Sequence, residues 1–175
     1  MSSGITREMI ERYKGVAVAT VYSGVSRLGY DPCFMREIQN LTPGRALVGR
    51  ARTLRFIPPR PDIILDTHLG EDSPEYHAMG SCEPGDVLVC DGMGRKYAAI
   101  GGDVKRLQLK MRGAAGIVTD AAIRDLDIVQ GYGLTIFAGG RTPAGGVWRD
   151  RPLRCQRHHP VRRGGRASRR PDRRR

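Results

Sequence analysis

Arg124 and Asp125 are the residues of this chain whose types and spacing most directly suggest chemistry. They close the run GGDVKRLQLKMRGAAGIVTDAAIRD, which begins just before Asp103. Carboxylate oxygens are hard ligands, and a site with one or two carboxylates suits Mg²⁺, which usually keeps several waters. The planar guanidinium of Arg124 can bind a carboxylate or phosphate through two parallel hydrogen bonds. If these side chains meet, the sequence predicts a small metal-dependent lyase site for an anionic substrate.

A helix starting near Asp103 and a strand returning the chain would bring the three residues together. Gly101 and Gly102 permit a sharp turn, and Asp103 is a good N-cap residue. About ten helical residues at roughly 1.5 Å each carry the chain about 15 Å outward. The apolar stretch 115–119, at roughly 3.3 Å per residue, returns it by about 16 Å. The residues expected on the apolar face of the helix are Val104, Leu107 and Met111.

The start of such a helix is itself suited to an anion. Its free N–H groups and the positive end of its dipole favour a carboxylate or phosphate, the same ligands that Arg124 prefers. Taken alone, an adjacent arginine and aspartate can be an ordinary solvated pair in a turn. The spacing from Asp103 and the surrounding glycines favour the functional interpretation.

Several stretches of the chain resemble the RraA-like family, which includes the 4-hydroxy-4-methyl-2-oxoglutarate/4-carboxy-4-hydroxy-2-oxoadipate aldolases. The stretches are VYSGVSRLGY, GRALVGRARTLRF, GDVLVCDGMG, AAIGGDV, RGAAGIVTDAAIRD and GLTIFAGG. They cover roughly residues 15–143. The resemblance implies that Asp125 holds the divalent metal, with Mg²⁺ expected, that Arg124 binds the 2-oxo acid end of the substrate, and that Asp103 positions a water.

The resemblance also assigns the substrate carboxylate to the backbone at the helix start. The residues expected to contribute to this binding are Gly102, Val104, Lys105 and Arg106, the last three through their N–H groups. The implied reaction is retro-aldol cleavage of 4-hydroxy-4-methyl-2-oxoglutarate-like 2-oxo acids to pyruvate by a class II, metal-dependent aldolase. Oxaloacetate decarboxylase activity is expected as a side reaction, because it passes through the same pyruvate enolate.

Two other interpretations stay open. Some members of the family are named for ribonuclease regulation, so the chain could be a non-catalytic regulator that binds a ribonuclease. It could also be an inactive, truncated family member. The joint presence of Asp103, Arg124 and Asp125 favours catalysis, because a purely regulatory protein would not need all three.

Helical and extended patterns alternate along the chain. Helices are expected at 5–14 and 17–28, where both would serve as packing elements, and extended segments at 46–57, 86–90 and 133–138. This order predicts a mixed α/β layered domain over 1–145. The resemblance makes it the β/β/α swivelling type, a homotrimer or dimer of trimers. His68 and His77 lie in an acidic loop at 61–80, but their spacing matches no usual metal-ligand pattern, which favours a solvated loop.

The formal net charge of +12 lies almost entirely in the arginine-rich end, from Arg149 to Arg175. This end has few apolar residues and no periodicity, so a disordered tail is expected at 146–175. It departs from the family, whose chains continue with further C-terminal β structure. A frameshifted or truncated end and a native basic tail are both open, and nucleic acid would be a partner only of a native tail, through phosphates.

The sequence shows neither a signal peptide nor a stretch long and apolar enough to cross a membrane, so a cytoplasmic protein is expected. The four cysteines show no C-x-x-C spacing, which argues against structural zinc and a disulfide framework.

Overall fold

The computed structural model describes residues 4–58, 60, 70–145 and 151–155, the last five by their backbone alone. Its centre is a six-stranded sheet of order β1-β5-β4-β3-β2-β6. The strands are β1 (Gln39–Asn40), β2 (Ala51–Ile57), β3 (Val87–Asp91), β4 (Gly116–Ile123), β5 (Thr135–Arg141) and β6 (Arg151–Cys155). The four inner strands are parallel, and the two edge strands run antiparallel to their neighbours.

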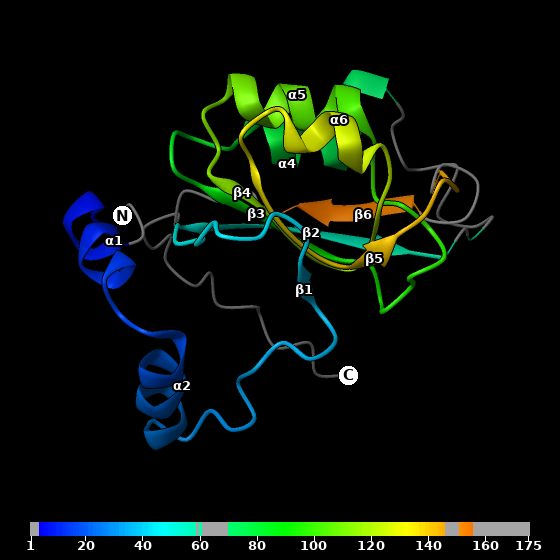
Figure 1. The fold of residues 1–175 in the computed structure, drawn as a ribbon. Coiled ribbons are helices and arrows are strands. Elements are labelled where there is room, and N and C mark those ends of the chain that lie inside the picture. Colours follow the sequence, from blue (N-terminus) through cyan, green and yellow to red (C-terminus); the bar gives the residue numbers. More distant parts are fainter. Residues whose placement is uncertain (1–3, 59, 61–69, 146–150, 156–175) are drawn as a thin grey trace, which may run out of the picture.

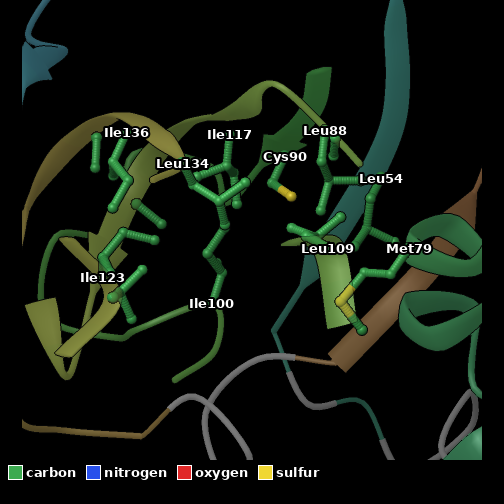
Figure 2. Close-up of a cluster of buried hydrophobic side chains, with 14 of the residues drawn as sticks. Leu54, Met79, Leu88, Cys90, Ile100, Leu109, Ile117, Ile123, Leu134 and Ile136 are labelled. Atoms are coloured by element: carbon green, nitrogen blue, oxygen red, sulfur yellow. The ribbon is translucent and has the colours of Figure 1, made fainter. Parts of the chain in front are cut away.

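Three helices cover one face of this sheet (Figure 1). They are α4 (Pro74–Gly80), which follows the 3-10 turn η1 (Gly70–Asp72), α5 (Asp103–Met111) and α6 (Leu126–Gln130). The apolar core lies between these helices and the sheet, where Met79, Leu109 and Ile117 are completely buried (Figure 2). Such an alternation of parallel strands and covering helices confirms the predicted mixed α/β class.

The N-terminal helices α1 (Arg7–Lys14) and α2 (Val18–Arg27) lie away from this helical layer (Figure 1). Thr6 caps α1 by accepting a hydrogen bond from the Met9 N–H at 3.2 Å. Neither helix contains a buried residue. Both helices form where the sequence predicted them, but the prediction that they are packing elements is wrong for the described chain.

The orientation of α5 differs from the predicted one. Val104 and Met111, expected to face the core, are 68% and 81% exposed, whereas Arg106 and Leu109 are buried. The connections at the two ends of the helix fix this orientation. After the helix, the Ala114 N–H donates to the Leu109 carbonyl at 3.1 Å, which directs the chain into β4. The turns that join this short helix to the sheet, rather than its apolar pattern, therefore determine which of its faces is buried.

Strand β6 lies within the stretch that was expected to be a disordered tail. It pairs with β2, although the register shifts between Arg55 and Phe56. The disorder prediction is therefore wrong for Arg151–Cys155, and the rest of 146–175 lies outside the described residues. An arginine-rich edge strand is compatible with the sheet, because charged side chains are common on exposed edges and pairing uses only the backbone. All strands of the described chain belong to this one sheet, so it shows no second β layer.

A buried carboxylate ties β2 to the beginning of β3. Asp86 is 2% exposed and accepts hydrogen bonds from Arg50 Nε at 2.9 Å, from Arg52 Nε at 2.7 Å and from the Glu83 N–H at 2.9 Å. Burial alone would raise the pKa of Asp86, but the hydrogen bonds from Arg50 and Arg52 outweigh it, so the pKa lies below its ordinary value. The ionised carboxylate therefore stabilises the folded state.

Replacing Asp86 with asparagine is expected to lower the free energy of unfolding at pH 7 by about 3 kcal/mol, because the buried Arg52 and the half-buried Arg50 lose their buried counter-charge and keep only the exposed Glu83. Urea denaturation measures this difference. The stabilisation is present above the unfolded-state pKa, about 3.9, and is lost as pH falls through the lower folded-state pKa, so the two proteins converge in acid. Asp91→Asn is the control, because its pair with Arg55 is exposed and worth about 1 kcal/mol at most. Equal losses in the two variants would contradict the account.

Candidate functional site

The segment that leads into α5 is held by backbone hydrogen bonds against the end of β4. The Ile100 N–H donates to the Ala122 carbonyl at 3.1 Å, and the Ala122 N–H donates to the Ala98 carbonyl at 3.3 Å. On its other side, the Ala99 N–H donates to the Ala144 carbonyl at 3.0 Å. The start of α5 is thereby placed beside the residues that follow β4, as the matched lengths of helix and strand predicted.

The structure brings Asp103, Arg124 and Asp125 together. The Asp103 N–H donates to Asp125 Oδ2 at 3.4 Å, and Arg124 Nε lies 3.3 Å from the same oxygen. Asp125 has a left-handed backbone, with φ 55°, and occupies the N-cap position of α6 without capping it through its side chain. An aspartate at that position usually caps its own helix. Here the carboxylate turns instead to the start of α5.

Gly102 leaves the space in which these groups meet. A Cβ at Gly102 would lie 2.3 Å from Asp125 Oδ2 and 2.6 Å from Arg124 Nε. The backbone of Gly102, with φ −109°, is open to any residue, so the requirement for glycine is steric. Gly145 approaches from the other side, where a Cβ would lie 3.1 Å from Arg124 Nη1. Sequence reasoning missed Gly145, because nothing in its neighbourhood marks it as close to Arg124.

Arg124 and Asp125 are accessible to a small solute, since their side chains are 41% and 37% exposed. Arg124 Nε itself is buried and makes no hydrogen bond with any described residue, although it lies 3.3 Å from Asp125 Oδ2. Because the side chain as a whole is partly exposed, the guanidinium can bind a planar anion. The pair therefore combines a cation, a carboxylate and a helix start in one small, open site.

The helix start offers fewer N–H groups than predicted, because α5 begins at Asp103 with Gly102 as its N-cap. The Arg106 N–H donates to the Gly102 carbonyl at 3.3 Å, so the prediction that it receives the substrate carboxylate is wrong. The N–H groups of Val104 and Lys105 have no partner among the described residues, as expected in a first helical turn. Asp103 is the first residue of the helix rather than its N-cap.

The oxygen donors at this site fit a hard divalent cation. The carboxylates of Asp103 and Asp125 belong to the start of α5 and the turn after β4, and such a pair suits Mg²⁺ with waters filling the remaining positions. Within the described ranges there is no cluster of three or more histidine, cysteine, aspartate or glutamate residues that could form a fuller protein cage. His77 is exposed on α4, and His68 lies outside the described residues.

The loop after β3 is anchored to β4 by a residue that sequence reasoning missed. The carboxylate of Asp120 accepts hydrogen bonds from the Gly92 N–H at 2.6 Å and the Gly94 N–H at 2.7 Å. Lys96, in the same loop, pairs with Glu37 at 2.6 Å. Asp120 could have been suspected only from its place at the end of an apolar strand.

Fold and site together define a mixed α/β domain in which the start of α5 lies beside an Arg-Asp pair. The RraA-like family profile, described as Aldolase/RraA, matches residues 18–170, and the chain belongs to this family. The match extends beyond residue 143, where the resemblance recognised from the sequence stretches ended. The family predicted from those stretches is thus confirmed.

A relative from Halalkalibacterium halodurans is named "Putative 4-hydroxy-4-methyl-2-oxoglutarate aldolase". It is 34% identical over 107 residues, which make up 61% of this chain and 46% of the relative. The chain therefore spans less than half the length of this relative. The relative is thus an aldolase by its name, and its similarity to this chain covers only part of each sequence.

Two solved structures represent the other named activity of the family. Streptomyces coelicolor RraAS2, described as an unusual member of the RNase ES inhibitor RraA protein family, is 29% identical with a TM-score of 0.75, covering 86% of this chain and 72% of that one. The RNA-processing inhibitor RraA from Thermus thermophilis is 25% identical with a TM-score of 0.50, covering 70% and 68%. No helix among the described residues is long and apolar enough to span a membrane.

Proposed function

We propose that this chain catalyses the divalent-metal-dependent retro-aldol cleavage of 4-hydroxy-4-methyl-2-oxoglutarate-like 2-oxo acids to pyruvate. The observation that carries the proposal is the meeting of Arg124, the Asp125 carboxylate and the Asp103 N–H in the space left by Gly102. The name of the H. halodurans relative supports the same reaction class.

Substrate binding follows from the charges at the site. The carboxylate of a 2-oxo acid would lie against the N–H groups of Val104 and Lys105, at the positive end of the α5 dipole. Arg124 would bind the same end of the substrate through its planar fork. Asp125 would hold Mg²⁺, which as a Lewis acid stabilises negative charge on oxygen.

The reaction requires stabilisation of a developing anion. The C3–C4 bond breaks, its electron pair moves onto the 2-oxo fragment to give the pyruvate enolate, and the C4 hydroxyl loses its proton as it becomes a carbonyl. Protonation at C3 then gives pyruvate. Arg124 places a fixed positive charge where the enolate oxygen forms, which lowers the barrier without reorganisation. Asp103 would position a water that takes part in the proton transfers.

Oxaloacetate decarboxylation is part of the proposal because it needs the same stabilisation. Loss of CO₂ leaves the electron pair on the same three-carbon fragment and gives the same enolate. The site would therefore act on both substrates. The two reactions would differ only in the group that leaves the three-carbon fragment.

The test is pyruvate release from 4-hydroxy-4-methyl-2-oxoglutarate and from oxaloacetate, measured with lactate dehydrogenase as coupling enzyme. Release is expected with Mg²⁺, should disappear with chelator and should return when the metal is restored. Reactions without protein correct for the spontaneous decarboxylation of oxaloacetate. Folded protein that releases no pyruvate, or that releases it regardless of chelator, would contradict the proposal.

A ribonuclease regulator is the second candidate, favoured by the similarity to RraAS2. A regulator would inhibit a purified RNase E-type enzyme and would retain that inhibition in an Asp125→Asn variant. Inhibition without pyruvate release would select this candidate, whereas pyruvate release without inhibition would exclude it.

We also propose that the chain assembles into a homotrimer or a dimer of trimers. The exposed apolar face of α5, formed by Val104, Leu107 and Met111, supports a subunit contact. Light scattering of a monomer at micromolar concentration would contradict this assembly.

A further inference from the structure

Arg106 has the largest side chain among those that are fully buried, with 1% exposure. Its Nη2 donates to the Ile100 carbonyl at 3.3 Å, and its Nε has no hydrogen-bond partner in the described chain. A guanidinium carries five N–H donors, and burying it with so few partners is costly. An apolar side chain of similar length would avoid this cost. The position of the guanidinium indicates a role beyond packing.

The guanidinium lies under the turn that opens α5. A Cβ at Gly101 would lie 3.2 Å from Arg106 Nη2, and Gly101 has φ +137°, a conformation that favours glycine. Ile100 is held from two directions, because its carbonyl accepts from Arg106 and its N–H donates to Ala122. Ala122 lies two residues before Arg124. One residue, Ile100, therefore connects the Arg106 side chain to the strand end that presents the Arg-Asp pair.

Among the described residues, no acidic side chain forms an ion pair or hydrogen bond with the Arg106 guanidinium. The groups that act on it electrostatically are Cys90 of β3 and Glu75 of α4. Glu75 is itself paired with Lys105 Nζ, and burial raises the pKa of the Cys90 thiol, which keeps it neutral. Burial lowers the pKa of Arg106, opposed by Cys90 and Glu75, but an arginine stays protonated at neutral pH. The helix start thus has a net positive charge behind it.

We infer that the Arg106 side chain is a positioning residue for the anionic substrate. It holds the Ile100–Gly102 turn so that the Val104 and Lys105 N–H groups face the Arg124–Asp125 pair, and its unpaired charge adds to the attraction of the helix start for a carboxylate. The inference rests on the proposed function, because it assigns Arg106 to that same site.

Arg106→Met tests the inference, since it removes the charge and the hydrogen bond while keeping a long side chain. Arg112→Met is the matched control, because Arg112 is an exposed arginine at the other end of the same helix. Oxalate, a planar dianion resembling the pyruvate enolate, serves as probe in the presence of Mg²⁺. Its dissociation constant, measured by calorimetry, is expected to rise about tenfold in Arg106→Met and to stay unchanged in Arg112→Met, as expected for loss of one charge-assisted interaction.

Amide hydrogen exchange gives a readout that does not depend on turnover. The Ile100 amide is expected to exchange about tenfold faster in Arg106→Met, whereas the amides of Ile117 and Val118 in the first half of β4 keep their protection. Arg106→Lys keeps the positive charge on a shorter side chain, so its oxalate affinity should lie between those of Arg106→Met and wild type. If the methionine variant does not fold, the lysine variant is compared with wild type in the same two measurements and should show the same local change at Ile100.

Two results would overturn the inference. One is wild-type oxalate affinity in Arg106→Met. The other is faster exchange spread evenly over β3 and β4, which would make Arg106 a general stability residue. Failure of the proposed function is distinguishable from both, because wild-type protein would then release no pyruvate while the Ile100 amide could still respond to the substitution.

Discussion

Asp125→Asn is expected to abolish magnesium-dependent pyruvate release, with kcat lowered about 10³-fold, the upper range for removing one preorganised charge-stabilising group. Asparagine has the same shape as aspartate and can still accept the hydrogen bond from the Asp103 N–H. It lacks the negative charge that a divalent cation requires. The fold should be retained, because the side chain is partly exposed and caps no helix.

The measurement is the pyruvate-release rate over a range of Mg²⁺ concentrations. Asp127→Asn is the control, because Asp127 lies two residues further along, exposed in the first turn of α6, and should behave as wild type. An Asp125→Asn rate within a few-fold of the control would show that the Asp125 carboxylate is dispensable, and the proposed metal ligand would be wrong.

Gly102→Ala is expected to lower kcat/KM at least about 100-fold, because a displacement of about 1 Å at a reacting group can cost that much. The added Cβ would lie 2.3 Å from Asp125 Oδ2 and 2.6 Å from Arg124 Nε, so at least one of these groups must move. The backbone is not strained by the change, since φ is −109°. The effect should therefore fall on activity much more than on stability, where about 1 kcal/mol is expected.

Gly140→Ala provides the comparison, because no atom lies within 4 Å of a Cβ at Gly140 and its φ is not positive. Turnover and thermal unfolding of the two variants should diverge, with activity lost only in Gly102→Ala. Equal activity in the two variants would mean that the space at Gly102 is not needed for the reaction.

The placement of the candidate site could be predicted from the sequence because it depends on chain length and local patterns. The glycines before Asp103, the length of the helix and the apolar strand before Arg124 determine where the chain returns. The structure accordingly has the Asp125 carboxylate at the Asp103 N–H. The parallel inner strands follow from short apolar runs separated by helical segments.

Other features depend on contacts that sequence patterns do not contain. A helical pattern placed Val104 and Met111 inside, whereas the connections of α5 bury Arg106 and Leu109. The one-residue shift in the start of α5 then removed the Arg106 N–H from the site. Strand β6 escaped prediction because pairing at a sheet edge uses backbone groups, which an arginine-rich composition does not reveal.

Binding of oxalate, with and without Mg²⁺, tests most directly the central claim that the site at the start of α5 binds both a metal ion, through Asp125, and a 2-oxo acid. Calorimetry on wild-type protein, Arg124→Lys and Asp125→Asn separates the two contributions. The account predicts binding to wild type only when Mg²⁺ is present, binding at least about 10-fold weaker in Arg124→Lys, which loses the bidentate fork, and no binding to Asp125→Asn. Oxalate binding that is equal in all three proteins, or indifferent to Mg²⁺, would contradict the claim.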